Sequence, residues 1–232
     1  MRGFLNKAQT AFTLPHYPPR TASMRKALSI LALCVAVMIP APGHAVEGME
    51  ITPEISTHLT KLGAYLNGIK SIQSDFVQIS STGDIAKGTL LLLRPKSLRI
   101  EYAPPTPILI VANGEYLSYI DTELDQVNHI PVDDTPAAFL LRDNFDFKSD
   151  DLVITGFERA AKAARISMVQ RKDPLAGELT LVFAEDPMVL RQWSIIDAQG
   201  TATHVTLINA RFDFPIPESQ FNVDLKALDN QR

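Results

Sequence analysis

Three histidines are the side chains best suited to metal or proton-transfer chemistry in the main part of this sequence. His58, His129 and His204 lie far apart along the chain, and none is accompanied by the ligand spacing of a known metal site. The sequence therefore gives little support to a metal centre, and we expect neither a metal nor any other cofactor.

Carboxylates are more abundant, and they gather in three short groups. Oxygen ligands of this kind suit calcium, but no group has the glycine-punctuated spacing of a known calcium loop. We therefore interpret the groups as solvated charges in turns. They are Asp121, Glu123 and Asp125; Asp133 and Asp134; and Asp150 and Asp151.

Markers of covalent and nucleotide chemistry are missing from residues 46–232. This segment has no Gly-x-Ser-x-Gly elbow, no Ser-x-x-Lys pair, no cysteine and no glycine-rich phosphate loop. The sequence thus favours a binding protein over an enzyme. A hydrolase is an alternative, because catalytic carboxylates can come from distant parts of a chain.

The first 45 residues differ from the rest in charge, with five basic residues and no acidic one. Arg25 and Lys26 precede an apolar run from Ala27 to Ile39, and a stretch rich in small residues follows up to Ala45. This order is typical of a secretory signal peptide, and we predict cleavage after Ala45. The apolar run is shorter than the roughly 20 residues that span a bilayer, which disfavours a membrane anchor.

Two residues of this segment carry alternatives. Met24 directly precedes the basic pair and offers a second start of translation. Cys34 raises the hypothesis of a lipid anchor, but Leu33 before it is larger than the residue that lipoprotein signal peptidases accept. We therefore favour a cysteine that serves as a small apolar residue.

The composition of residues 46–232 limits what they do. This segment keeps 17 of the 22 Lys and Arg and all 26 Asp and Glu, a formal net charge of −9, and 46% of the whole chain is hydrophobic. We expect one globular domain over 46–232, and its acidity disfavours nucleic acid as a partner. An acidic, exported domain without cysteine fits the periplasm.

A helix is predicted near the start of this domain. Thr52, Pro53 and Glu54 supply a cap, a first-turn proline and a first-turn acid. An apolar stripe follows, which suits a helix on an ordinary core as well as one that covers a ligand. The stripe consists of Ile55, Leu59, Leu62, Leu66 and Ile69.

From Ile72 the apolar period changes to two, with turn residues about every ten positions, which predicts an antiparallel sheet. Asn113-Gly114 marks one tight hairpin, and Asp134-Thr135-Pro136 predicts a short helix that continues over 137–141. We expect a mainly β fold with helices, in which two helical elements pack on one strongly curved antiparallel sheet. The predicted strands are 74–80, 87–94, 97–102, 108–112, 115–120, 126–130, 152–157, 164–171, 178–184, 189–197 and 202–212.

The most distinctive stretch runs from Gly88 to Pro105. Arg94 has the same parity as Leu98, so a cation is expected at the rim of an apolar surface if the break at Pro95 preserves the register. The facing of the leucine run 90–93 cannot be deduced, because all four residues are alike. Strand alternation makes Leu98, Ile100 and Tyr102 oppose Arg99 and Glu101.

This stretch resembles the periplasmic outer-membrane lipoprotein carrier family, LolA. Order and spacing agree from Leu59 to Phe145, and beyond Phe145 only the strand pattern is shared. The shared features are Phe76-x-Gln78, the strand from Gly88 to Arg94-Pro95, the strand from Leu98 to Tyr102, Pro105, Asn113-Gly114, Thr135-Pro136 and Phe139-Leu140-Leu141.

The resemblance implies an incomplete β-barrel that is covered by helices as a lid and encloses an apolar cavity for lipoprotein acyl chains. It implies a monomeric carrier without enzymatic activity. Such a carrier accepts acylated lipoproteins from an inner-membrane lipoprotein-releasing ABC transporter and passes them to an outer-membrane lipoprotein receptor or to the outer membrane. The alternative is a periplasmic regulatory module of the same fold that senses lipids or lipoproteins.

Individual positions follow from the same resemblance. Arg94 corresponds to the family's arginine that bonds to the backbone of the lid and influences opening; a solvated arginine at a strand end is an equal alternative. Leu98 occupies a cavity-wall position that is often aromatic in the family. For Trp193, an ordinary core role fits as well as a cavity role. The expected acyl-chain lining is Phe76, Leu98, Ile100, Tyr102, Ile110, Phe139, Leu140 and Trp193.

Overall fold

Eleven strands form one antiparallel sheet in the computed structural model, which describes residues 47–135 and 138–223. The expected signal peptide, its cleavage site at Ala45, and Pro136 of the expected short helix lie outside the described residues. The strands are β1 (Ser71–Ser80), β2 (Ile85–Leu93), β3 (Ser97–Tyr102), β4 (Ile108–Asn113), β5 (Tyr116–Asp121), β6 (Gln126–Pro131), β7 (Leu152–Ala160), β8 (Ala163–Gln170), β9 (Gly177–Glu185), β10 (Met188–Asp197) and β11 (Ala202–Phe212).

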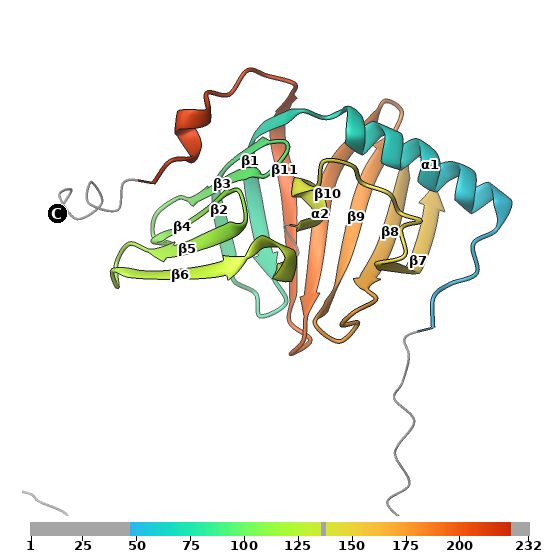
Figure 1. Ribbon diagram of the computed structural model, residues 1–232, viewed down its shortest axis with the longest axis horizontal. Helices are drawn as coiled ribbons and strands as arrows, with labels where there is room; N and C mark the ends of the chain where they lie inside the picture. Colours follow the sequence, from blue (N-terminus) through green and yellow to red (C-terminus); the bar gives the residue numbers. More distant parts are fainter. Residues whose placement is uncertain (1–46, 136–137, 224–232) are drawn as a thin grey trace, which may run out of the picture. The chain divides into compact units, whose positions relative to one another are not determined.

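The strand order shows two meanders that meet at the centre of the sheet (Figure 1). Strands β6 to β1 lie in reverse sequence order on one side, and β11 to β7 continue on the other. The junction is the antiparallel pair of β1 and β11, which brings Phe76 opposite Leu207. The two edges are therefore β6 and β7, which follow one another along the chain, and the sheet is not closed.

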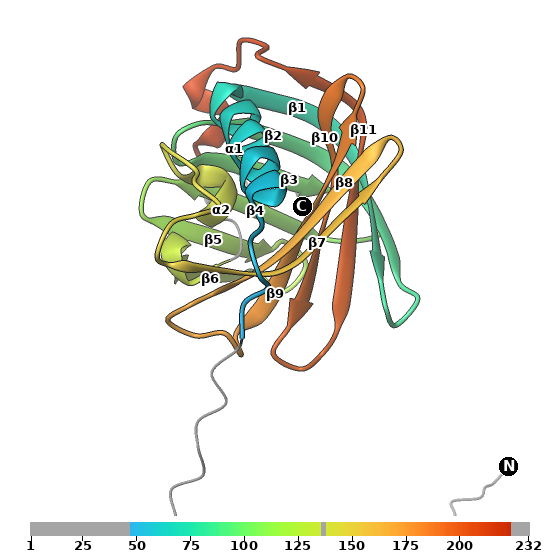
Figure 2. The ribbon, with the colours of Figure 1, turned by 90° about the vertical axis from the view of Figure 1, so that its right-hand side faces the viewer.

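Helix α1 (Pro53–Gly68) begins where the sequence predicted. Thr52 Oγ1 accepts a hydrogen bond from the Ile55 amide (3.3 Å), and Pro53 lies in the first turn. The apolar stripe of the helix is buried, including Leu59 and Leu62, and joins the main core of the protein. Figure 2 shows α1 on the inner side of the curved sheet, between its two halves.

The connection between the two edge strands carries two short helices. A 3-10 turn η1 (Val132–Asp134) follows β6, and helix α2 (Ala138–Leu141) comes next. Thr135 donates its hydroxyl to the Val132 carbonyl (2.8 Å) and so closes η1. A second 3-10 turn, η2 (Glu218–Phe221), follows β11.

The sheet buries apolar side chains on both faces, in two separate clusters. The larger cluster fills the concave side and includes α1, α2 and strands from both halves. The smaller cluster lies on the convex side, where Phe221 of η2 packs on Val111 and Ile120. In the leucine run of β2, Leu90 and Leu92 join the concave cluster, whereas its odd-numbered members pack against the convex one.

Candidate functional site

The concave side of the sheet and the inner sides of α1 and α2 meet in one apolar interior. All eight residues that the sequence proposed as an acyl-chain lining lie there, although they come from five different elements. Four are buried members of the core and four are partly buried against it. The buried ones are Phe76, Leu98, Phe139 and Trp193, and the others are Ile100, Tyr102, Ile110 and Leu140.

The register between β2, β3 and β4 places the apolar side chains of these strands next to one another. Leu98 on β3 lies opposite Leu92 on β2, and Ile100 lies opposite Leu90 on one side and Ile110 on the other. Cross-strand partners on one face have Cβ atoms only about 4.5–5.5 Å apart, so these side chains contact one another directly. The result is a continuous apolar surface across β2, β3 and β4.

Gly88 makes room for the aromatic end of this surface. It pairs with Phe76 across β1 and β2, and a Cβ atom at this position would lie 2.7 Å from the Phe76 ring and 2.2 Å from the Glu101 carbonyl oxygen. The Phe76 ring then packs edge-on against Tyr102, with 5.3 Å between ring centroids. Sequence reasoning gave Gly88 no such role, because the requirement arises from the pairing of β1 with β2.

One polar pair lies at this aromatic end. The Tyr102 hydroxyl donates a hydrogen bond to Gln78 Oε1 (2.7 Å). Burial raises the pKa of Tyr102 above its ordinary value, and Tyr119 adds to the increase. The phenol therefore stays neutral and keeps its proton for Gln78.

The space at the centre of the interior is very small. A void of about 10 Å³ lies next to Arg94, between α1, α2 and the sheet, with Leu66, Leu92 and Leu140 among its walls. This is about the space that one water molecule occupies, whereas ligand pockets commonly enclose about 300–1,000 Å³. The void is too small for a long apolar ligand.

Arg94 joins the sheet to both helices at this point. Its guanidinium donates hydrogen bonds to the carbonyl of Leu66, in the last turn of α1, and to the carbonyl of Arg142, directly after α2, where the Nε–O distance is 3.2 Å. The carbonyl end of a helix attracts cations, which favours this arrangement. Arg94 is only partly exposed, so the geometry favours the bonded interpretation over a solvated arginine.

Burial lowers the pKa of the Arg94 guanidinium below its ordinary value, and the negative charge of Asp143 acts in the opposite direction. An arginine nevertheless stays protonated in proteins. A permanent positive charge is therefore held among backbone carbonyls at the rim of an apolar interior. The amide of Lys96, two positions later, adds a hydrogen bond to the Leu141 carbonyl (3.2 Å).

Two further side chains that sequence reasoning missed attach α1 to its surroundings. The Tyr65 hydroxyl accepts a hydrogen bond from the Leu190 amide (3.1 Å), next to a bulge in β10. Asn67 bonds to both the amide (2.7 Å) and the carbonyl (2.9 Å) of Phe145. Polar residues beside an apolar helical stripe were the only available signal, and they do not reveal their partners.

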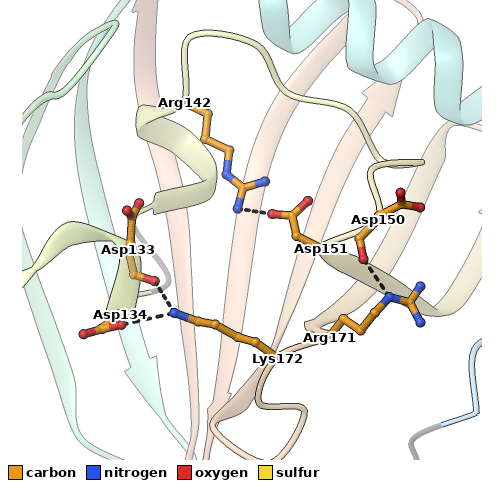
Figure 3. A network of polar contacts seen from close by, with 7 residues as sticks. All are labelled: Asp133, Asp134, Arg142, Asp150, Asp151, Arg171 and Lys172. Atoms are coloured by element: carbon orange, nitrogen blue, oxygen red, sulfur yellow. Dashed lines mark hydrogen bonds and ion pairs between the residues drawn. The ribbon is translucent and has the colours of Figure 1, made fainter.

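A network of ion pairs lies between the two edges of the sheet (Figure 3). Lys172, in the turn between β8 and β9, lies 3.2 Å from Asp134 Oδ1, and its ammonium also donates to the Asp133 carbonyl (3.5 Å). Arg142, after α2, pairs with Asp151 at 2.5 Å. Of the seven carboxylates that we expected as solvated turn charges, six are exposed and Asp121 is half-buried. Asp134 and Asp151 have basic partners.

The electrostatics of the Asp151 pair follow from its position. Burial acts to raise the pKa of Asp151, but hydrogen bonding and the charge of Arg142 outweigh it, and the pKa lies below its ordinary value. Nearby, Arg171 donates to the carbonyls of Asp150 (2.6 Å) and Leu152 (3.2 Å). Two arginines thus hold the start of β7: Arg142, which follows α2, and Arg171, which follows β8.

The described residues, 47–135 and 138–223, hold no group of three or more His, Cys, Asp and Glu side chains that could bind a metal ion. His129 instead lies 3.0 Å from the Ser118 hydroxyl, and His58 lies 3.6 Å from Glu185. In the same part of the chain, no helix is long and apolar enough to cross a membrane.

Comparison with known sequences assigns the family. The family described as "Outer membrane lipoprotein carrier protein LolA" matches residues 67–224, more than half of the chain. The chain belongs to the LolA family. This confirms the resemblance seen in the sequence and extends it through the second half of the sheet, where only the strand pattern had been shared.

Two curated relatives of this LolA-family chain differ in how much they cover. An uncharacterized protein of Rickettsia prowazekii is 40% identical over 93 residues, which are 40% of this chain and 44% of that protein, so the match spans less than half of the relative. An outer-membrane lipoprotein carrier protein of Chromobacterium violaceum is 26% identical over 73% of this chain and 84% of its own length.

Among solved structures, a LolA superfamily protein from Nitrosomonas europaea is similar with a TM-score of 0.43 and 10% sequence identity. The similarity covers 72% of this chain and 97% of that one.

Proposed function

We propose that this LolA-family protein is a carrier that shields the acyl chains of lipoproteins in its apolar interior and transfers lipoproteins from the inner to the outer membrane. The observation that carries the proposal is the interior itself. It is apolar on the sheet side and on the helix side, and it contains almost no free volume. Arg94 joins the two sides through hydrogen bonds to the carbonyls of Leu66 and Arg142.

The physical problem of such a carrier is the affinity of acyl chains for their membrane. Burial of one methylene group contributes about 0.8 kcal/mol, so a chain of about sixteen carbons gains roughly 12 kcal/mol over water. The carrier must match much of this free energy and still release the chain. A closed resting state allows both uptake and release, because the free energy needed to open the protein reduces the net free energy of acyl-chain binding.

In the proposed cycle, α1 and α2 form a lid and Arg94 holds the lid closed. Entry of an acyl chain breaks the bonds from the guanidinium to the Leu66 and Arg142 carbonyls, and hydrogen bonds to charged groups contribute about 1.5–3 kcal/mol each. The chain then lies against Phe76, Leu98 and the other lining residues. Release allows the same bonds to form again, which favours the empty, closed state.

The proposal includes a place and partners for the protein. Export by the N-terminal signal, with cleavage after Ala45, would deliver the domain 46–232 to the periplasm. There it would act as a monomer, accept lipoproteins from an inner-membrane lipoprotein-releasing ABC transporter, and deliver them to an outer-membrane receptor or the outer membrane. No catalytic step is required, because each transfer only moves an apolar chain between apolar environments.

The test is detergent-free purification of the protein from periplasm, followed by mass spectrometry of the bound material. We expect a one-to-one complex with acylated lipoprotein in the parent protein and its loss in Leu98→Glu, because the new carboxylate faces the interior. Arg99→Glu is the matched control, since it puts a carboxylate on the neighbouring residue of β3, which faces the other side of the sheet.

Circular dichroism and thermal unfolding must show that both variants are folded. Unchanged lipoprotein recovery with folded Leu98→Glu would refute the carrier proposal. Recovery of free lipid without lipoprotein would support the alternative, a module of the same fold that senses lipids.

A further inference from the structure

Strand β6 (Gln126–Pro131) is an edge whose outer side has no strand partner among the described residues. It pairs with β5 in a continuous register, from Tyr116 opposite Pro131 to Asp121 opposite Gln126. An edge strand turns about half of its backbone N–H and C=O groups away from its neighbour. These groups form a template for one more strand.

The features that usually protect an edge are missing from β6. The strand contains no Asp, Glu, Lys or Arg and no bulge, and its proline is its last residue. The opposite edge, β7, is protected in three ways. It has a bulge between Ile154 and Gly156 and exposed charges at Glu158 and Arg159, and the Ile154 carbonyl accepts a hydrogen bond from the Met49 amide (2.9 Å).

A groove of about 820 Å³ runs beside β6 on the convex face of the sheet. Its walls are mainly apolar and aromatic, with Tyr116 and Val127 on the strands and Phe221 on the segment after β11, and polar side chains such as Ser118 and His129 lie among them. Tyr116 is 56% exposed. This groove lies on the outer face, opposite the interior that we propose for acyl chains, so it is a separate place for apolar side chains.

Acidic side chains of the segment that forms this edge outnumber the basic side chains near it. The segment from Glu115 to Asp134, which contains β5, β6 and η1, has six acidic residues and no lysine or arginine. Asp134 pairs with Lys172 from outside the segment. Lys96 and Arg142 line a pocket together with Glu115 and Asp133. The edge therefore attracts cations, and it repels a segment that is acidic like most of this protein.

We propose that β6 binds an extended, basic segment of a partner protein by strand addition. Backbone hydrogen bonds to β6 would supply general affinity, alternate side chains would enter the convex groove, and lysines or arginines would face the acidic flanks. This mode needs no opening of the interior. It gives the protein a docking edge for another protein that is independent of whatever the interior carries.

The test measures amide hydrogen exchange of the purified protein with and without a synthetic peptide. The probe is acetyl-KVTVRVTK-amide, and the matched control is acetyl-EVTVEVTE-amide, which keeps the alternation and reverses the charge. We expect the basic peptide to slow exchange of the outward amides of β6 by about tenfold or more and to leave β7 unchanged. The acidic peptide should bind about tenfold more weakly, because several surface charge pairs are reversed.

A variant pair tests the position of binding. Val127→Lys adds a cation beside the groove on β6, and Glu158→Lys makes a comparable change on β7. We expect the first to abolish the peptide effect and the second to preserve it. Because the measurement on the parent protein needs no substitution, it stands even if Val127→Lys fails to fold.

Four results would overturn the inference. They are unchanged exchange of β6 with excess basic peptide, equal slowing of β7, equal binding of the acidic peptide, and slowing of β6 that depends only on protein concentration, which would indicate a second copy of this chain. Deletion of residues 224–232 provides a last control. If it speeds exchange of β6 without any peptide, the occupant of this edge is the chain's own end. None of these results would bear on the carrier proposal, because β6 and the convex groove lie outside the apolar interior.

Discussion

The guanidinium of Arg94 donates a hydrogen bond to the backbone carbonyl of Leu66, 28 positions earlier in the chain. A side chain from the turn between β2 and β3 thus supplies a donor to the last turn of α1, where carbonyls run out of partners within the helix. The same guanidinium bonds to the Arg142 carbonyl after α2. One residue therefore links the sheet to two helices that are distant in sequence.

We predict that Arg94→Leu loosens this closed arrangement. Loss of hydrogen bonds from a charged donor should lower the free energy of unfolding by about 1.5–3 kcal/mol. Because opening then costs less, the affinity for an apolar dye such as bis-ANS should rise about tenfold. Urea denaturation and dye titration measure the two effects.

Arg99→Leu is the control for this variant, since Arg99 lies on β3 and pairs with the exposed Glu101 at 2.8 Å. It should change neither quantity appreciably, because exposed ion pairs contribute about 0–1 kcal/mol. Equal dye affinity in the two variants would show that Arg94 does not control opening.

Gly88 yields a second prediction, about stability. A Cβ atom there would meet the Glu101 carbonyl oxygen at 2.2 Å, a backbone atom that cannot swing aside. We expect Gly88→Ala to lower the free energy of unfolding by about 1–3 kcal/mol, as overpacking does. Gly68→Ala, at a position with nothing within 4 Å, is the matched change and should cost nothing. If urea denaturation gives the same result for both, Phe76 and Glu101 are not packed against Gly88 as described.

A third prediction concerns alkaline pH. Burial raises the pKa of Tyr65 and of Tyr102 above the ordinary value of 10.0. Above that pH the unfolded chain loses these protons while the folded protein keeps them, so stability is complete below pH 10.0 and declines as the pH rises toward the folded values. Tyr102→Phe should make the decline shallower, measured by urea denaturation at a series of pH values.

The control for the pH series is Tyr116→Phe, because that side chain is 56% exposed. The alkaline decline of Tyr102→Phe is compared with the declines of this variant and of the parent protein. A Tyr102→Phe variant with the full alkaline decline would show that the Tyr102 phenol does not contribute to it.

The secondary structure of this protein could be predicted from the sequence because it depends on local patterns. Period-two alternation and turn residues located all eleven strands, and the Thr52-Pro53-Glu54 start located α1. The four leucines of β2 were the exception. Their facing depends on the register with β1, where Leu92 lies opposite Ile72, and not on any contrast between neighbours.

The apolar periods also predicted one curved antiparallel sheet with two helical elements on it, but the incomplete barrel was implied only by the family resemblance. The pairing of β1 with β11 joins the first and last strands of the chain, and no short-range pattern in the sequence specifies it. The same holds for the partners of Tyr65 and Asn67, which lie far away in the sequence. The parity of Arg94 with Leu98 predicted a cation at the rim, and its bonds to a helical lid were implied by the resemblance. Its acceptors are backbone carbonyls, which any sequence would provide.

The position of β6 and β7 at opposite ends of the sheet, although they are consecutive in the chain, makes this sheet a split ring with a strap across its gap. The strap consists of the described residues 132–135 and 138–151, which carry η1 and α2. Widening the gap requires no strand to leave its neighbour. It would separate ion pairs such as Lys172–Asp134 and Arg142–Asp151, at about 0–1 kcal/mol each, together with apolar contacts of the concave cluster and the hydrogen bonds of Arg94. Widening at this gap would leave the pairing of β1 with β11 at the centre of the sheet intact.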